Sequence, residues 1–388
     1  MKEKIVILGA GYGGILAANR LAKQVNDIEI LLINESDFFY ERVRNHETAV
    51  SGKDHKISIT KLIRPKITFL QDKVKQISPN KNEVILNKQT LVYDYLVYAL
   101  GSTAVSKSEN ETSVTQYGEA KKIFENFNQD TCGNITILGA GLTGIELAFE
   151  WKEKYPKTKI TILDRGEFAG IFSDNVKKYI REKCEKNSIT IKDKTKYLNF
   201  LNGFVHTEGS DPFQSDLVIN CLGMLSSDIG KISNLPTNDK NQVIVNSYLQ
   251  VNQYSNIFCI GDSASVKNSY LRSGCVTALP MGAYVADSIA NRIKSKSVSK
   301  FDFKFIGRCV SLGRSDGIIQ FTNPNDSPKN LFLKGKFAAL FKELVVKFTV
   351  VSLYLEKVLP FRFYFWPKAD IETINSKQNV QHRESVSV

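Results

Sequence analysis

Two glycine triplets are the clearest chemical signature of this chain. Each has the spacing Gly-x-Gly-x-x-Gly, follows an apolar strand pattern and precedes an apolar helical pattern. The triplets are Gly9, Gly11 and Gly14 in one case and Gly139, Gly141 and Gly144 in the other. Glycines at these positions let the backbone approach a pyrophosphate, whose charge the helix N-terminus stabilises. The sequence therefore predicts two dinucleotide-binding sites.

An acid follows each triplet at the end of the next apolar strand. Glu35 ends "IEILLINE" about twenty residues after Gly14, and Asp164 has the comparable place in "TKITILDR". A carboxylate there accepts hydrogen bonds from ribose hydroxyls and repels a 2′-phosphate, so Asp164 favours NADH. The next residue, Arg165, is of the type that recognises a 2′-phosphate, so NADPH stays open as the less favoured nucleotide.

The repeat extends beyond the glycine triplets. Asp94 precedes Gly101 by seven residues in "YDYLVYALGS", and Asp216 precedes Gly223 by seven in "SDLVINCLGM". Both stretches enclose an apolar strand that opens into a glycine turn. Short strand-like runs with turn residues between them precede each stretch and predict a small antiparallel meander. Two complete nucleotide-binding units are expected.

A later strand pattern, "NIFCIGDSA", ends in Gly261 and Asp262. We expect a helix to begin near Ser263, so that Asp262 either caps this helix or faces a bound ligand beside it. Because the pattern follows the second unit, the chain is expected to return and complete the first unit. Residues 301–320 predict a further strand pair.

Length and charge narrow the function classes. The 388 residues exceed one ordinary domain, and the formal net charge is +12. The lysines are spread along the chain with no basic block, so anionic cofactors or a membrane surface explain the charge better than nucleic acid. No apolar run reaches the roughly 18 residues of a membrane-spanning helix. The first strand begins too early for a signal peptide, so a cytoplasmic location is expected.

The spacing of the cysteines excludes a paired-cysteine redox motif and a zinc site. The six cysteines lie at positions 132, 184, 221, 259, 275 and 309, so the closest pair is 16 residues apart. This spacing contains no CxxC or CxxxxC motif and no zinc-ligand pattern. No metal site is expected, and the cysteines are expected to be reduced and buried.

The ordered set of motifs resembles the two-dinucleotide-binding flavoproteins of the pyridine nucleotide-disulfide oxidoreductase superfamily, over about residues 1–290. The resemblance implies an α/β fold with two Rossmann-like domains: a discontinuous FAD-binding domain (1–110 and 250–330) and an inserted NAD(P)H-binding domain (111–249). It implies that FAD binds the first triplet with Glu35, Gly101, Gly261 and Asp262, the last on the flavin ribitol. It assigns NADH to the second triplet and Asp164.

Within the superfamily the chain looks most like type II NADH dehydrogenases. "GAGLTGIELAFEW" resembles their GxGxTGxExAxE motif, and "NHETAVSG" resembles a stretch that follows their second FAD strand. The resemblance implies that Glu146 faces the junction of nicotinamide and flavin and tunes binding or proton delivery. Alternatively, Glu146 lies in the first helical turn and complements the helix dipole. His46 is a candidate proton relay to a quinone or, alternatively, a packed side chain.

One departure from that family concerns the electron acceptor. Its AQxxxQ-like quinone signature is replaced here by "TALPMGAYVAD", residues 277–287, which has neither glutamine. The donor and the flavin are therefore better supported by the sequence than the acceptor. A quinone is still the expected acceptor, with a ferredoxin- or rubredoxin-like protein as the alternative. A flavin and NADH redox sensor without significant turnover is a third interpretation.

The C-terminal region differs from the rest of the chain. Residues 331–370 are rich in aromatic residues and lysine, with a helical pattern from Lys336 to Lys357, and residues 371–388 predict a disordered tail. Apolar, aromatic and cationic residues together suit a helix at a membrane interface. Packing on the FAD-binding domain or on a homodimer partner is the alternative. The sequence predicts an FAD-dependent NADH dehydrogenase, peripheral on the cytoplasmic face of a membrane, that passes electrons to a quinone.

Overall fold

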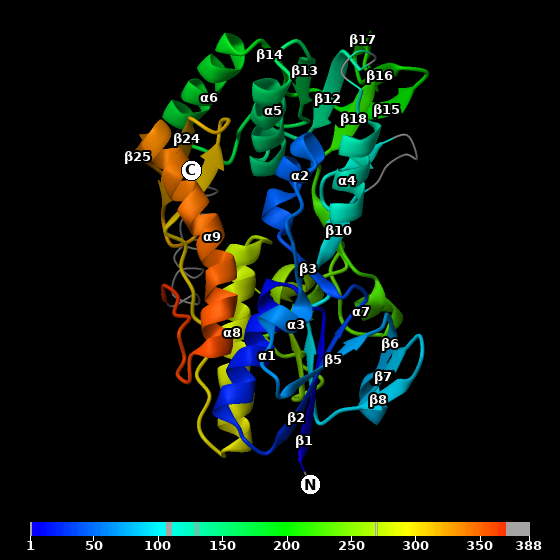
Figure 1. Ribbon diagram of the computed structural model, residues 1–388, viewed down its shortest axis with the longest axis vertical. Helices are drawn as coiled ribbons and strands as arrows, with labels where there is room; N and C mark the ends of the chain where they lie inside the picture. The colour runs from blue at the N-terminus through cyan, green and yellow to red at the C-terminus, as the bar shows by residue number, and fades with distance from the viewer. Residues whose placement is uncertain are drawn as a thin grey trace, which may run out of the picture.

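In a computed structural model the chain forms two α/β units, one above the other, with a long C-terminal helix along one side (Figure 1). The structure describes residues 2–105, 111–128, 130, 132–267, 269 and 271–369. Each unit is built around a five-stranded sheet. The predicted α/β class with two Rossmann-like units is confirmed. The tail predicted to be disordered, 371–388, lies outside the described residues.

The first unit contains a sheet in which every neighbouring pair is parallel. Its strand order is β21 (Ile257–Cys259), β9 (Tyr95–Tyr98), β1 (Glu3–Leu8), β2 (Ile28–Asn34) and β5 (Ile67–Gln71). The strands are nearly continuous apolar runs because helices cover the sheet. Two of these helices are α1 (Tyr12–Gln24) and α8 (Cys275–Ile293), which pack on each other. Strand β21 comes from beyond the second unit and completes the first sheet, as predicted.

The second unit repeats this plan with a second parallel sheet. Its strand order is β11 (Thr112–Ser113), β18 (Leu217–Asn220), β12 (Asn134–Leu138), β13 (Lys159–Leu163) and β14 (Ile189–Lys192). Its helices are α4 (Tyr117–Asn126), α5 (Leu142–Lys154) and α6 (Asp174–Lys186). The second glycine triplet lies between β12 and α5, as the first lies between β1 and α1.

Both predicted meanders are present as three-stranded antiparallel sheets. They are β6 (Val74–Ser78), β7 (Glu83–Leu86) and β8 (Thr90–Val92) in the first unit, and β15 (Tyr197–Leu201), β16 (Phe204–Thr207) and β17 (Ser210–Gln214) in the second. Where the chain crosses between units, β10 (Ser102–Ala104) pairs with β19 (Met224–Ser226). This pairing fixes the two units beside each other.

A short excursion after β2 also reaches from the first unit to the second. It consists of β3 (Phe38–Tyr40), a 3-10 turn (Arg42–Arg44), α2 (Asn45–Ser51), β4 (Lys56–Ser58) and α3 (Ile59–Leu62). Helix α2 packs against α4 and α5, and Ala49 and Val50 belong to the apolar core of the second unit. This excursion therefore brings His46 to the junction between the units.

Two predicted domain boundaries need correction. Helix α7 (Ile229–Ile232), β20 (Val243–Val245) and β22 (Ala264–Val266) lie with the first unit: β20 pairs with β22, and Val243 and Val245 belong to the first core. The second unit therefore ends near β19 and not at residue 249. Conversely, β23 (Gly307–Ser311) packs against α5, and Val310 and Ile318 belong to the second core. The reason is tertiary: each apolar strand face packs where an uncovered apolar surface is available.

The C-terminal part begins with a three-stranded antiparallel sheet made of β23, β24 (Gly317–Thr322) and β25 (Pro328–Lys334). Helix α9 (Lys336–Val358) follows and packs on α1 (Figure 1). It confirms the predicted helix and buries Ala338, Val346 and Leu353. No helix in the described part of the chain is both long and apolar enough to cross a membrane.

Candidate functional site

The first glycine triplet forms a tight loop with one open position. A Cβ on Gly9 would lie 2.2 Å from the Ala99 carbonyl oxygen, and one on Gly14 would lie 2.0 Å from the Gly9 carbonyl oxygen. A Cβ on Gly11 would have no atom within 4 Å. Gly9 and Gly14 are therefore required by the fold, whereas Gly11 leaves space at the N-terminus of α1 for a pyrophosphate.

In the second triplet, too, two glycines are required by the fold and the middle one leaves open space. A Cβ on Gly139 would lie 3.0 Å from the Cys221 carbonyl oxygen, and one on Gly144 would lie 2.0 Å from the Gly139 carbonyl oxygen. Gly141 again has no atom within 4 Å of its Cβ position. Both loops thus fit a dinucleotide by the same geometric test.

The acids predicted to bind the riboses occupy unequal positions. Glu35 is exposed and forms an ion pair with Lys73 at 3.1 Å. Asp164 accepts hydrogen bonds from the backbone amides of Ala140 at 2.6 Å and Gly166 at 2.7 Å. In the first unit Ala10 donates instead to Asn34, at 3.0 Å. Asp164 is therefore the counterpart of Asn34, and the predicted equivalence of Asp164 with Glu35 is wrong by one residue.

A cavity of about 490 Å³ lies between the two units. It brings together many of the residues singled out in the sequence, with contributions from both units and from α9. Those lining it are Gly11, Gly14, His46, Gly101, Glu146, Gly261 and Asp262. The predicted residues that do not line it are Gly9, Glu35, Gly139, Gly141, Gly144 and Asp164. The first glycine loop therefore opens into the cavity between the units, whereas Asp164, at the end of β13, does not line it.

Asp262 is held by neighbours on three elements. Its carboxylate accepts hydrogen bonds from the Ser102 hydroxyl at 2.8 Å and the Gly274 amide at 2.7 Å, and Arg42 lies 3.7 Å away. The helix expected to begin near Ser263 begins instead at Cys275, because a 3-10 turn and strand β22 intervene. Asp262 nevertheless binds the amide of Gly274, the residue that precedes α8.

Glu146 lies at the centre of a small polar cluster inside the cavity. Lys342 of α9 approaches it at 3.2 Å, the Ser311 amide donates to it at 3.1 Å, and His46 Nδ1 lies 4.0 Å away. Glu146 is the fifth residue of α5, and no acid occupies the first turn. The alternative that this acid complements the helix terminus from the first turn is therefore wrong. Glu146 and His46 are brought together as predicted candidates.

Lys342 is a residue that the sequence analysis missed. It lies on the face of α9 that also carries Ala338 and Val346, four residues before and after it, and both are buried. A lysine within an otherwise buried helical stripe is the signal that could have identified it. Its side chain also donates to the Ser311 hydroxyl at 3.2 Å.

Burial controls the protonation of His46. The side chain is 4% exposed, and desolvation lowers its pKa to about 4 despite the nearby carboxylate of Glu146. His46 is therefore neutral at pH 7. It can accept or donate a hydrogen bond there, but it carries no charge to compensate a developing anion.

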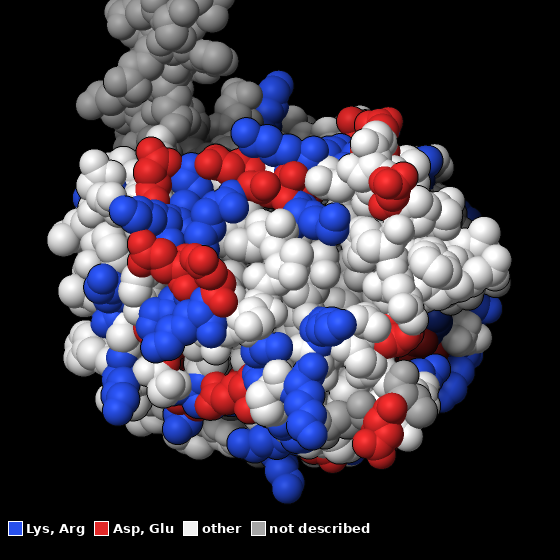
Figure 2. Space-filling view, turned by 90° about the horizontal axis from the view of Figure 1, so that it is seen from above, with Lys and Arg blue, Asp and Glu red and all other residues white. Residues whose placement is uncertain are grey.

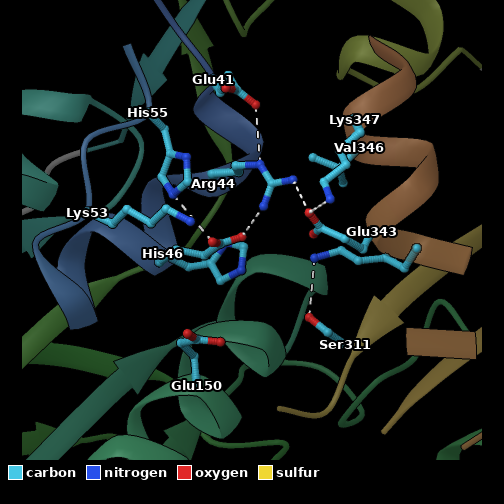
Figure 3. A network of polar contacts seen from close by, with 12 residues as sticks. Glu41, Arg44, His46, Lys53, His55, Glu150, Ser311, Glu343, Val346 and Lys347 are labelled. Atoms are coloured by element: carbon cyan, nitrogen blue, oxygen red, sulfur yellow. Dashed lines mark hydrogen bonds and ion pairs between the residues drawn. The ribbon is translucent and has the colours of Figure 1, made fainter. Parts of the chain in front are cut away.

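A second ionic cluster, next to the first, connects α2 to α9. Arg44 lies between Glu41 and Glu343 (Figure 3). It also contacts Glu47 at 2.8 Å. Burial opposes ionisation of Glu47, but His55, whose Nε2 lies 3.3 Å from the carboxylate, and the surrounding cations outweigh it and hold the pKa of Glu47 well below its usual range. The Arg44–Glu343 contact measures 2.7 Å and holds the N-terminal half of α9 beside the cavity.

All six cysteines are free thiols. Three of them, Cys221, Cys275 and Cys309, line the cavity. Burial raises the pKa of Cys221 to about 12 and those of Cys275 and Cys309 to about 11. These thiols are protonated at pH 7, and protonated thiols are poor nucleophiles. These three cysteines therefore do not supply a thiolate to the cavity at pH 7.

Comparisons with known proteins agree with this geometry. The family model described as "Pyridine nucleotide-disulphide oxidoreductase" matches residues 3–288. Apoptosis-inducing factor homolog B of Dictyostelium discoideum is 27% identical over 354 residues, covering 83% of this chain and 90% of that protein. The type II NADH:quinone oxidoreductase of Staphylococcus aureus is 24% identical over 380 residues, covering 86% and 93%.

A solved structure extends the similarity to the whole fold. The sulfide:quinone oxidoreductase of the hyperthermophilic bacterium Aquifex aeolicus superimposes with a TM-score of 0.81 at 19% identity, covering 92% of each chain. The family match covers most of this chain, including both glycine loops, and implies binding of a flavin and a nicotinamide nucleotide. The chain therefore belongs to the pyridine nucleotide-disulphide oxidoreductase family and is an NAD(P)H-dependent oxidoreductase.

Proposed function

We propose that the chain is an FAD-dependent NAD(P)H dehydrogenase that reduces a quinone at a membrane surface. One observation carries the proposal: Lys342, Val345 and Val346 of α9 form a wall of the cavity that holds Glu146 and the first glycine loop. Val345 also belongs to the exposed apolar face of the same helix. An apolar acceptor therefore has a short route from an apolar surface to the redox site.

Some residues of the cavity would bind the cofactor, and one residue would protonate the acceptor. FAD, when bound, can accept a hydride from the nicotinamide and pass electrons to the acceptor singly or in pairs. The N-terminus of α1 would bind its pyrophosphate, and Asp262 would accept a hydrogen bond from its ribitol. Lys342 is a cation held between Glu146 and Ser311, so it can donate a proton to a reduced acceptor oxygen.

The exposed face of α9 supports contact with a membrane. Its apolar residues recur at intervals of three and four and are at least 37% exposed: Phe337, Leu340, Phe341, Leu344, Val345, Phe348, Val351, Tyr354 and Val358. Phe361 and Phe365, beyond the helix, are 60% and 75% exposed. Lys347, Arg362 and Lys368 lie among them, which suits an interface with anionic lipid.

The end of the molecule that carries the second unit offers less to a protein acceptor. Viewed from the end that carries the second unit, acidic and basic side chains alternate around an uncharged centre (Figure 2). Steering of an acidic redox protein requires a field of one sign. This face therefore gives no support to a ferredoxin-like acceptor, and a quinone remains the proposed acceptor.

The test of the acceptor is a stopped-flow experiment on purified holoenzyme. Protein reduced with NADH or NADPH is mixed in turn with a menaquinone analogue, with oxygen and with a ferredoxin, and recovery of the flavin absorbance is followed. Fastest recovery with the quinone supports the proposal. Fastest recovery with ferredoxin, slow recovery with every acceptor, or protein without flavin contradicts it.

The membrane surface is tested by co-sedimentation with vesicles that contain anionic lipid. Leu344→Asp with Phe348→Asp places two charges in the exposed apolar face and should abolish binding. Leu198→Asp with Leu201→Asp is the matched control, since both are exposed apolar residues of β15 in the second unit, 48% and 52% exposed. Equal binding by all three proteins would refute the role of α9.

A further inference from the structure

The ends of the second strands in the two units can be compared atom by atom. Gly9 donates from its amide to the Ile33 carbonyl at 2.7 Å, and Gly139 donates to the Leu163 carbonyl, also at 2.7 Å. The strand registers agree, since Leu8 is paired with Ile33 and Leu138 with Leu163. Ile33 and Leu163 are therefore equivalent positions.

The following residue has the same task in both units. The amide after the first glycine donates to its side chain: Ala10 to Asn34, and Ala140 to Asp164. Both oxygens of the Asp164 carboxylate are used by backbone amides, because the second accepts from Gly166 at 2.7 Å. Asp164 ties the glycine loop to β13, as Asn34 ties its loop to β2.

The family resemblance assigns the FAD ribose to Glu35, so the equivalent position in the second unit falls one residue after Asp164. In the first unit it is Glu35, a carboxylate suited to the hydroxyls of an unphosphorylated ribose. In the second unit it is Arg165, which is exposed like Glu35. An arginine at this position binds a 2′-phosphate in bidentate fashion and offers nothing comparable to a free hydroxyl.

The charges around Arg165 make the position more favourable for an anion. Two nearby acids are paired with other cations: Glu167 with Lys177 at 2.9 Å, and Asp193 with Arg181. The carboxylate of Asp164 is instead bound by two backbone amides. Lys194 is exposed, and its amide donates to the Gly166 carbonyl at 2.8 Å. Within the described ranges, no ion pair of the Arg165 or Lys194 side chain is found, whereas Glu35 is paired with Lys73.

We propose that the second unit selects a nucleotide bearing a 2′-phosphate, so that NADPH is preferred to NADH, and that Arg165 is the specificity-determining residue. This inference rests on the proposed function in one respect, that the second unit binds the reduced nicotinamide nucleotide. It reverses the expectation drawn from Asp164 in the sequence. The phosphate carries roughly two negative charges at pH 7, which Arg165 and Lys194 together match.

The test measures binding without turnover. FAD-loaded protein is titrated calorimetrically with ADP-ribose and with 2′-phospho-ADP-ribose, which differ only in the phosphate. We expect the phosphorylated probe to bind at least about tenfold more tightly, as for a charge-assisted bidentate contact. Arg165→Glu copies the residue of the first unit and should reverse the order of the two affinities.

A matched variant separates local recognition from general charge. Lys178→Glu makes the same charge change at an exposed position of α6, and it should leave the affinity ratio within about twofold of wild type. Folding of each variant is checked by flavin content and circular dichroism. A wild-type preference for ADP-ribose, or an unchanged ratio in Arg165→Glu, overturns the inference. Failure of both probes and of both reduced nucleotides to bind instead contradicts the proposed function.

Discussion

Removal of one buried charge should release the C-terminal helix. Glu356 on α9 is fully buried and accepts from Arg20 at 3.0 Å and from Lys23 at 2.7 Å, both on α1. It also accepts from the Phe363 amide at 2.9 Å, which holds the aromatic segment after the helix. Arg20 is 1% exposed and is bound as well by Asp287 of α8. This cluster therefore joins three helices.

Glu356→Gln keeps the shape of the side chain and removes its charge. The two cations of α1 then lose their shared partner, although Arg20 keeps Asp287. Breaking a buried ion pair in this way costs about 3–5 kcal/mol. Because about 1.4 kcal/mol corresponds to a factor of ten, the equilibrium for detachment of α9 should rise more than about a hundredfold.

Amide hydrogen exchange in α9 measures this equilibrium directly. We expect exchange in residues 346–356 to accelerate by that factor, while exchange in the strands of the second unit is unchanged. Lys347→Gln is the matched control, since its side chain is 64% exposed and contacts Glu343 at only 3.6 Å. It should change the rate less than about threefold. Acceleration below tenfold in Glu356→Gln would refute the reasoning.

The remaining predictions concern the site. The folded state holds the pKa of His46 near 4, below its unfolded value, so its contribution to stability is complete above about pH 6.5 and is lost as the pH falls toward 4. The free energy of unfolding, measured in urea at several pH values, should fall by about 3 kcal/mol less in His46→Gln than in wild type over that interval. Parallel curves for the two proteins would contradict this. Lys342→Met should slow flavin reoxidation by quinone about tenfold to a hundredfold and leave flavin reduction unchanged in stopped flow; equal slowing of both steps would exclude an acceptor-side role. Gly141→Val should fold with normal thermal stability yet lose nicotinamide nucleotide binding in titrations, whereas Gly144→Ala should unfold at lower temperature; normal nucleotide binding by Gly141→Val would contradict the assignment of that loop.

Much of the nucleotide-binding framework could be predicted because its determinants are local. The strand, glycine triplet and helix follow one another without interruption, from Glu3 to Gln24 in the first unit, and backbone geometry alone dictates where glycine is required. A Cβ at Gly14 or Gly144 would lie 2.0 Å from a carbonyl oxygen, which expresses that requirement directly. The return of the chain through β21 was also predictable, because its glycine turn repeats the pattern of the earlier strands.

The exact counterpart of Glu35 could not be read from spacing. Asp164 and Arg165 are adjacent, and a shift of one residue exchanges a carboxylate for a guanidinium. Only the hydrogen bond from Ala140 to Asp164 identifies which of them completes the loop. Spacing rules of about twenty residues cannot resolve that difference.

The sequence by itself determined the two nucleotide-binding units and the lack of a CxxC or CxxxxC motif, since each is read from residues close together in the chain. The return of β21 to the first unit was predicted from the order of the strand patterns along the chain. Tertiary structure decided how those units form one site. Lys342 reaches Glu146 across 196 positions of sequence, and α2 leaves the first unit to pack on the second. Such contacts depend on which apolar faces remain uncovered after local folding, and that is a property of the assembled surfaces and not of any segment alone.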